Sequence, residues 1–521
     1  MSIDSQLPAS LEGPVAERLR AAAGESVARR IWERDGTLWA PERSGDERSA
    51  RGRSTPEVTD RLGWLDIAER MAAEVDDLRA FAAGVRDDGH TDAVLLGMGG
   101  SSLGPEVLRR SFGEGAVRLH VLDTTHPDQI RAVRDALDLS RTLFIVSSKS
   151  GGTIETMSQF KYFHALQGDG SHFVAVTDPG TALAQLAAEH GFRRVFENDP
   201  DIGGRYSVLS YFGLVPAAIA GVDLDGILRT AQEAMEACQR QEDNPGLELG
   251  AALGELALRG RDKLTFVVDP PLESLGLWAE QLVAESTGKQ ARGILPIADE
   301  PLVNASAYGD DRVFCHIETG DAENAGKVAE LAAAGHPVFT VGADGPADLG
   351  RVFFVAEFAT AVAGWVLGIN PFDQPNVQEA KDNTQRVLSD PSGPPELEPG
   401  DLDALRAGLA PPRYLAIMAY LPYSEQVEAG TARMRERLLT ECRVATTFGY
   451  GPRFLHSTGQ FHKGGPPVGA FVQVVDEPQQ DVEIPGEPYT FGTLIRAQAD
   501  GDLQTLRSHG LDAVRIGKES L

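Results

Sequence analysis

The chain has 521 residues, enough for about three domains, and its apolar fraction of 42% is that of a globular protein. Its net charge of −29 argues against nucleic acid or an anionic membrane as a partner, and no apolar run approaches the ~20 residues of a membrane span. The scattered cysteines Cys238, Cys315 and Cys442 form no disulfide pattern, and the N-terminus lacks an apolar signal segment. We therefore expect a cytoplasmic protein.

The first unit, residues 1–90, is predicted to be helical. Apolar residues recur at helical spacing in 16–21 and 64–71. Between them, the charged segment 43–59 is rich in Gly, Ser and Pro and is predicted to be a loop.

Strands and helices alternate from residue 91 onward, which predicts an α/β fold with parallel sheets. A first domain, 91–250, and a second, 251–400, each read as a doubly wound sheet. A Pro- and Gly-rich linker, 390–400, precedes a C-terminal α/β segment, 401–521. The predicted strands are 93–96, 119–122, 143–146, 173–176, 264–268, 337–341, 352–355, 414–419 and 471–475, and the helix 425–438 follows the eighth of them.

A cradle for a phosphate group is predicted directly after strand 143–146. The strand ends in hydroxylic and glycine residues, and a helix then begins whose positive dipole end favours an anion. The glycines let the backbone turn its N–H groups toward the ligand. Lys149 either contacts the phosphate or is solvated, and the sequence favours neither. The hydroxyls come from Ser148, Ser150 and Thr153, and the glycines are Gly151 and Gly152.

A second glycine-rich loop, Gly97-Met-Gly-Gly-Ser-Ser-Leu-Gly104, follows strand 93–96. Ligands of open α/β sheets lie outside the carboxyl ends of the strands, so one ligand can meet both loops. The loop lacks the spacing of a dinucleotide fingerprint. Two such loops on neighbouring strands fit a single monophosphate better.

Two charged residues are suited to acid–base chemistry. Arg205 follows paired glycines, stays charged and can stabilise an oxyanion, although a surface salt bridge is the plain alternative. Glu285 follows the predicted helix 275–284, where the negative end of the helix dipole favours proton uptake and suits a general base.

Polar residues nearer the C-terminus extend this set. Gln374 and Lys381 are seven residues apart, so they share one face if Pro375 begins a helix. His456 and His462 lie in a glycine-rich segment, where core histidines are rare. No acidic or Cys partner is spaced for zinc, so we predict an acid–base role for one of the two.

Taken in order, these motifs resemble those of the glucose-6-phosphate isomerase family, within the sugar isomerase domain superfamily. Segments 30–39 and 449–460 resemble the isomerase half of bacterial transaldolase–phosphoglucose isomerase fusions, although no room remains here for a transaldolase barrel. The matching motifs are 97–105, 148–156, 203–207, 285–289 and 370–375, with Lys381.

The resemblance implies reversible isomerisation of D-glucose 6-phosphate and D-fructose 6-phosphate through a cis-enediol, in glycolysis and gluconeogenesis, without a metal or organic cofactor. It implies that Glu285 moves the proton between C2 and C1 and that Arg205 stabilises the enediolate. Lys381 and a histidine would open and close the ring. The implied phosphate-binding residues are Gly100, Ser101, Ser148, Ser150 and Thr153, with Gln374 nearby and Lys149 as a further candidate.

The histidine departs from the family pattern. In the better-known branch it follows a Thr-Asn-Gly-Gln segment placed before the lysine. Here the similar Ser457-Thr-Gly-Gln460 follows Lys381, with His456 and His462 on either side, while His316 lies in the earlier interval without the motif. We choose His456. Because the family supplies this histidine from the neighbouring subunit, the resemblance implies a homodimer.

Two other functions stay open. One is a dual phosphoglucose/phosphomannose isomerase. The other is a non-catalytic phosphosugar-binding regulatory protein, which would need the phosphate cradle but neither Glu285 nor Lys381.

Overall fold

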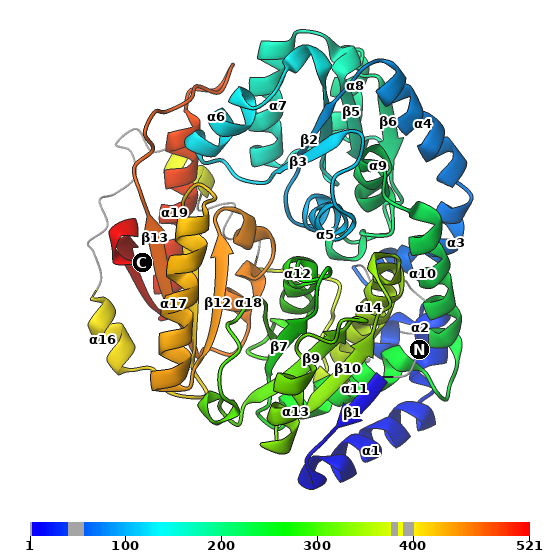
Figure 1. Cartoon of the computed structure of the whole chain (residues 1–521), viewed down its shortest axis with the longest axis vertical. Coiled ribbons are helices and arrows are strands. Elements are labelled where there is room, and N and C mark those ends of the chain that lie inside the picture. The colour runs from blue at the N-terminus through cyan, green and yellow to red at the C-terminus, as the bar shows by residue number, and fades with distance from the viewer. Residues whose placement is uncertain (1–2, 40–56, 377–383, 389–400) are drawn as a thin grey trace, which may run out of the picture.

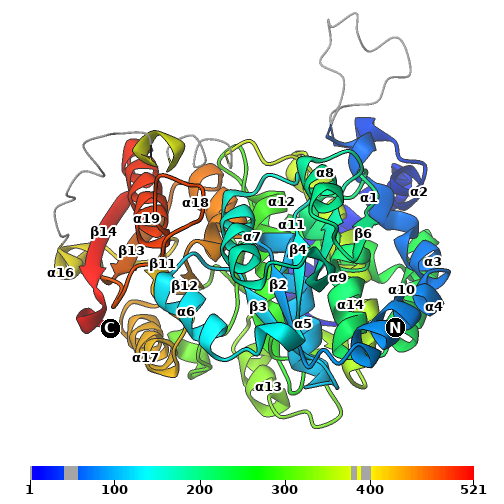
Figure 2. The same cartoon turned by 90° about the horizontal axis from the view of Figure 1, so that it is seen from above.

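The computed structural model describes residues 3–39, 57–376, 384–388 and 401–521 (Figure 1). Most of the predicted loop 43–59, the linker 390–400 and Lys381 lie outside these ranges. Within them, the strands form three sheets, and the C-terminal unit lies beside both other sheet-containing parts (Figure 1, Figure 2).

The first sheet is wholly parallel and confirms the predicted strands of this region. In its order, β3-β2-β4-β5-β6, the strand that comes first in the sequence of this sheet, β2, lies between the next two strands, β3 and β4. The short edge strand β6 was not predicted. The strands are β2 (Asp92–Leu96), β3 (Arg118–Leu122), β4 (Thr142–Ser147), β5 (Phe173–Thr177) and β6 (Arg194–Glu197).

Helices cover both faces of this sheet. Alternate residues of β2 enter different cores: Ala93 and Leu95 pack with α4, α5 and α9, whereas Val94 and Leu96 pack with α6, α7 and α8. Burial on both faces explains why β2, β4 and β5 are continuous apolar runs. The helices are α4 (Val75–Asp87), α5 (Leu103–Phe112), α6 (Pro127–Asp135), α7 (Ile154–Gln167), α8 (Ala182–Glu189) and α9 (Tyr211–Ala220).

The second sheet has the order β1-β10-β9-β7-β8. Its edge strand β1 comes from the N-terminal unit, which was predicted to be helical, and pairs antiparallel with β10. The strands are β1 (Ile3–Gln6), β7 (Lys263–Val268), β8 (Leu295–Ile297), β9 (Arg312–Glu318) and β10 (Val338–Gly342). Helices of this region and the N-terminal unit are α1 (Ala9–Gly24), α2 (Val27–Trp32), α3 (Ile67–Ala72), α10 (Leu224–Gln239), α11 (Pro245–Leu258), α12 (Leu275–Thr287), α13 (Ala325–Ala333) and α14 (Leu349–Leu367).

The predicted strand 352–355 is wrong, because these residues lie within the helix α14. This helix packs against α10, α11 and α12, so it is buried on nearly every side and loses the one-sided apolar pattern of a surface helix. In the described part of the chain, only Pro346–Leu367 is long and apolar enough to cross a membrane. Since 83% of that window is buried inside the protein, its apolar character is that of a core helix.

The C-terminal unit repeats the same strand order. Its parallel sheet, β12-β11-β13-β14, again has the first strand between the second and third, as in flavodoxin-like folds, so the predicted α/β fold is confirmed. The strands are β11 (Tyr414–Tyr420), β12 (Ala445–Tyr450), β13 (Gly469–Val475) and β14 (Asp512–Gly517). The helices are α16 (Leu402–Ala407), α17 (Glu425–Cys442), α18 (Gly459–Gly464) and α19 (Phe491–Ser508).

Candidate active site

The loop after β2 is a junction of four parts of the chain. A Cβ on Gly100 would lie 1.9 Å from the carbonyl oxygen of Gly204, so only glycine allows this approach. Gly99 has a φ of +55°, and a Cβ there would lie 2.8 Å from the His456 carbonyl and 2.9 Å from Gln281 Nε2. The neighbouring Ser101 is buried. The loop therefore contacts α12, the C-terminal unit and the 3₁₀ turn Gly204–Tyr206, which contains Arg205 and is called the arginine turn below.

The predicted phosphate loop follows the neighbouring strand β4. Ser148 is buried, and its hydroxyl lies 3.0 Å from Thr153 Oγ1. Gly151 has a φ of +68°, and Ser150 is exposed. Thr153 stands at the N-terminus of the 14-residue helix α7 and makes no side-chain capping bond. The start of this helix can therefore receive an anion.

Lys149 is partly exposed and its ammonium already has two partners, so its contact with phosphate stays a prediction. Its ammonium pairs with Asp178 and donates to the Pro200 carbonyl at 2.9 Å. These contacts hold the loop to the segments after β5 and β6, so the structure favours a supporting role for this side chain.

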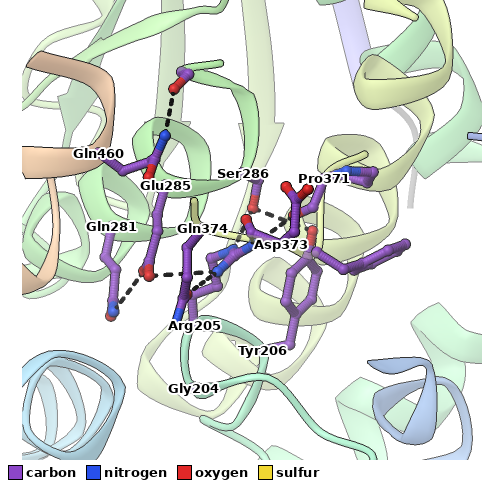
Figure 3. A network of polar contacts seen from close by, with 12 residues as sticks. Gly204, Arg205, Tyr206, Gln281, Glu285, Ser286, Pro371, Asp373, Gln374 and Gln460 are labelled. Carbon is purple, nitrogen blue, oxygen red and sulfur yellow. Dashed lines mark hydrogen bonds and ion pairs between the residues drawn. The ribbon is translucent and has the colours of Figure 1, made fainter. Parts of the chain in front are cut away.

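Arg205 is the centre of a buried polar network (Figure 3). Only 2% of its side chain is exposed, so the alternative of a surface salt bridge is wrong. Each guanidinium nitrogen donates to oxygen. Nε donates to Ser286 Oγ at 2.8 Å, Nη1 to Gln374 Oε1 at 2.8 Å, and Nη2 to the carbonyls of Pro371 at 2.7 Å and Asp373 at 3.0 Å.

Glu285 lies between Arg205 and Gln281 (Figure 3). It occupies the last turn of α12, which runs two residues beyond it to Thr287. Its Oε1 is 3.4 Å from Arg205 Nη1, and its Oε2 accepts from Gln281 Nε2 at 3.0 Å. One turn of the same helix thus positions the carboxylate and its amide partner.

Lys289 fixes the segment that carries Gln374. It is buried, donates to the Asn370 carbonyl at 2.6 Å and lies 2.7 Å from Asp373 Oδ1. Burial, together with the nearby Arg205 charge, lowers the pKa of this lysine to about 7. Gln374 itself is exposed and lies in an irregular segment, and most of the helix predicted to begin at Pro375 falls outside the described residues.

His456 meets a carboxylate of the first domain. It lies in the 3₁₀ turn Arg453–His456, and its Nε2 is 2.9 Å from Oε1 of Glu155 in the first turn of α7. The same oxygen accepts from Gln498 Nε2 at 2.7 Å. The resemblance implied a histidine from a neighbouring subunit, whereas His456 contacts Glu155 of its own chain. The catalytic role of His456 and the homodimer both stay predictions.

The other two candidate histidines, His462 and His316, are buried side chains. His462, predicted to be a loop residue, lies in α18 instead, with its ring centroid 5.2 Å from that of Phe471. Burial lowers its pKa to about 3, so it is a neutral core residue. His316 is buried on β9, and its Nε2 is 3.2 Å from Asp269 Oδ2.

Several residues of the network were not predicted from the sequence to belong to the site. Glu155 lies inside the phosphate-loop motif, and its position in the first turn of a helix was the available signal. Gln281 stands one turn before Glu285. Ser286 and Gln460 stand inside motifs that the sequence analysis named, but no role was assigned to them, and Gln498 carries no sequence signal. Among the described residues, no group of three or more His, Cys, Asp or Glu could hold a metal ion.

Known proteins are similar to this chain in sequence. The family model described as phosphoglucose isomerase matches residues 63–292. The glucose-6-phosphate isomerase of Rubrobacter xylanophilus is 30% identical over 365 residues, which cover 59% of this chain and 84% of that protein. The chain belongs to the glucose-6-phosphate isomerase family. A second member, from Thermus thermophilus, is 36% identical over 240 residues, covering 44% of this chain and 56% of its own length.

Solved structures agree with the fold. A hypothetical protein, also from Thermus thermophilus, superposes with a TM-score of 0.62 at 26% identity, covering 74% of this chain and 100% of its own. The glucose-6-phosphate isomerase from Chlamydia trachomatis gives a TM-score of 0.59 at 20% identity, covering 72% of this chain and 87% of its own, which supports the fold alone.

Proposed function

We propose that the chain interconverts D-glucose 6-phosphate and D-fructose 6-phosphate by proton transfer through a cis-enediol, as a step of glycolysis and gluconeogenesis in the cytoplasm. The main support is the buried Arg205–Glu285 pair, held where the arginine turn meets the glycine-rich loop after β2. We also keep as a proposal the division into units 1–90, 91–250, 251–400 and 401–521.

The loops would hold the substrate by its phosphate. Ser148 and Thr153 offer hydroxyls, the start of α7 offers N–H groups, and Gly100, Ser101 and Ser150 complete the lining. Gln374 lies on the arginine side through its bond to Arg205. An anion in this position leaves the sugar carbons free to extend toward Glu285.

Glu285 would act as the base. Its carboxylate removes the proton from C2 of the open-chain aldose and returns it to C1. The C2–H bond electrons form the C1–C2 double bond and displace the carbonyl electrons onto O1, where the Arg205 guanidinium stabilises the negative charge. A proton then passes from the C2 hydroxyl to O1, and the C2 carbonyl forms as C1 takes up the proton from Glu285. Because Arg205 is already fixed by four hydrogen bonds, it need not reorganise during the reaction.

His456 would open and close the sugar ring. A carboxylate oxygen of Glu155 accepts a hydrogen bond from Nε2, so Nε2 carries the proton and Nδ1 is left to exchange one with the substrate. Lys381 is proposed as the second ring-opening group on the resemblance alone, since it lies outside the described residues. Arg205 supplies the charge that stabilises the enediolate, so no step is assigned to a metal or cofactor.

The direct test supplies fructose 6-phosphate and measures glucose 6-phosphate through a coupled dehydrogenase, with and without a chelator. We expect turnover that the chelator leaves unchanged, and loss of activity with chelator would contradict the proton-transfer route. Repeating the assay with mannose 6-phosphate separates the dual isomerase. A protein that binds the sugar phosphate without converting it would instead be the regulatory alternative.

A further inference from the structure

We propose that a cavity of about 450 Å³, lined by all three sheet-containing parts of the chain, binds an α-amino acid in its zwitterionic form. The proposal goes beyond the isomerase function and does not depend on it. The cavity lies between α5 and β3 of the first domain, α12 of the second, and α17 and β12 of the C-terminal unit. Its volume is in the range of pockets that bind small molecules.

Most charged side chains around the cavity already have partners. Glu106 accepts from Arg109 at 2.8 and 2.9 Å and from Arg110 at 2.6 Å. Arg435 donates to two main-chain carbonyls of the second domain, both at 2.8 Å, and to the hydroxyl and carbonyl of Thr446. A ligand that bound to any of these groups would have to compete with existing hydrogen bonds.

Arg453 differs from these arginines, because its guanidinium donates no hydrogen bond to any described residue. Only 15% of its side chain is exposed, and its ion pair with Asp123 Oδ2 is long, at 3.8 Å from Nη1. The rings of Tyr423 and Tyr450 lie 5.5 and 5.8 Å from the central guanidinium carbon. Such cation–π contacts hold the group without using its N–H bonds, so these stay available to a ligand carboxylate.

Carboxylate oxygens that lack a hydrogen-bond donor line the same cavity. Asp123 is 2% exposed, and its Oδ1 accepts from the Tyr423 hydroxyl, but its Oδ2 has no hydrogen-bond partner in the described part of the chain. The side chain of Asp299 forms no hydrogen bond or ion pair with a described residue, while its carbonyl accepts from Arg435. Acceptors without donors are costly in a buried place, so these oxygens favour a ligand that donates hydrogen bonds.

The balance of charge selects the ligand. A simple anion on Arg453 would also meet Asp123, and a simple cation beside Asp123 and Asp299 would also meet Arg453. Burial raises the pKa of both aspartates, and an ammonium group beside them would favour their charged form. Burial raises the pKa of the neighbouring Glu280 to about 8, so it is largely protonated at pH 7 and adds little charge. An amino acid places a carboxylate on Arg453 and an ammonium near the aspartates without adding net charge to the cavity.

The cavity is separate from the phosphate cradle. Asp123 follows β3, whereas the phosphate loop follows β4, and β2 lies between these two strands. Arg453 begins the 3₁₀ turn that ends at His456, and Leu277 of the cavity wall lies on α12, which also carries Glu285. A bound amino acid would therefore contact the elements that carry two proposed catalytic groups, and it would leave the sugar-phosphate site free.

Variants locate the binding. Asp299→Asn removes one charge with little effect on folding, because the Asp299 side chain has no described partner to lose, and Arg453→Gln removes the cation. Each should weaken binding of the amino acid by about tenfold to hundredfold, the worth of one charge-assisted hydrogen bond. Arg413→Gln is the matched control, because Arg413 lies in the same unit but pairs with Asp512 outside the cavity. If Arg453→Gln does not fold, Asp299→Asn alone decides.

Titration calorimetry on the full chain, with each common L-amino acid as the probe, supplies the measurement. We expect at least one amino acid to bind with a dissociation constant of about 1 mM or less, and its binding to persist in saturating fructose 6-phosphate. Its methyl ester, which lacks the carboxylate, and its N-acetyl derivative, which lacks the ammonium, should each bind at least about tenfold more weakly. The proposal is overturned if no amino acid binds, if fructose 6-phosphate displaces it, or if either derivative binds equally well. Affinity that stays unchanged in Asp299→Asn, or that falls equally in Arg413→Gln, overturns it as well.

Discussion

Replacing Glu285 by glutamine removes the proposed base while preserving its shape. The amide oxygen of the introduced side chain can take the place of Oε1 beside Arg205, and its NH2 group can donate to Gln281 once that amide is flipped, so the network keeps its geometry. What disappears is the ability to take up a proton from carbon. We therefore expect Glu285→Gln to bind fructose 6-phosphate with KM changed only a few-fold, and to lose turnover.

The size of this loss follows from the chemistry assigned to the residue. General-base catalysis contributes about 10²–10⁴ in rate, or ~2.7–5.4 kcal/mol of transition-state stabilisation. Removing one member of a buried ion pair usually destabilises the fold, but Arg205 keeps four hydrogen bonds to oxygen, and its contact with Glu285 is long at 3.4 Å. We expect the melting temperature to fall by no more than about 3 °C.

Glu280→Gln is the matched control. Glu280 is also buried on α12, but its carboxylate accepts from the Ala298 N–H at 3.2 Å, whereas that of Glu285 faces Arg205. Burial raises the pKa of Glu280 to about 8, so it is largely protonated at pH 7 and a glutamine resembles the form already present. The coupled assay should show turnover within a few-fold of wild type. Near-wild-type turnover in Glu285→Gln, or equal losses in both variants, would refute the assignment of the base.

Four further changes probe other parts of the account. Gly100→Ala should abolish activity or soluble expression, because its Cβ would lie 1.9 Å from the Gly204 carbonyl, and a normally active, folded variant would contradict that close approach. His456→Asn should lower turnover ~10²–10⁴-fold with little change in melting temperature. His462→Asn should mainly lower the melting temperature. If His462→Asn lost turnover and His456→Asn lost only stability, the roles assigned to the two histidines would be wrong. Glu357 is buried, and neither of its oxygens has a hydrogen-bond partner in the described part of the chain. Burial raises its pKa well above 4.5, so its contribution to stability falls as pH rises from about 4.5 toward the folded pKa. Glu357→Gln should therefore gain more in melting temperature at pH 8 than at pH 5, and equal gains would contradict a neutral buried carboxyl.

The sequence predicted those strands that are apolar throughout. β2, β4 and β5 are buried on both faces, so a short apolar run marks each one. β9 was not predicted as a strand because it contains a charged residue, Arg312. This arginine is fully buried and forms an ion pair with Glu300 at 2.7 Å. α14 was mistaken for a strand in part, because a helix buried on every side has no polar face to reveal its period.

The site was predictable where its residues stand in local motifs. Arg205 and Glu285 follow turns and helix ends whose chemistry is visible in a few residues. The environment of Lys149 depends on Asp178 and Pro200, and that of His456 on Glu155, 301 residues away. Such long-range pairings are set by how three sheets pack together, and residue spacing does not encode them.

Isomerisation in deuterium oxide tests the central claim most directly. Fructose 6-phosphate is converted in D₂O, and the glucose 6-phosphate formed is analysed by NMR for deuterium at C2. Glu285 is 7% exposed, so the proton that it carries can exchange in part with solvent before it is delivered. Proton transfer through Glu285 therefore predicts partial entry of deuterium at C2, at a rate that falls together with turnover in Glu285→Gln. Deuterium entry and turnover left unchanged in Glu285→Gln would contradict the account.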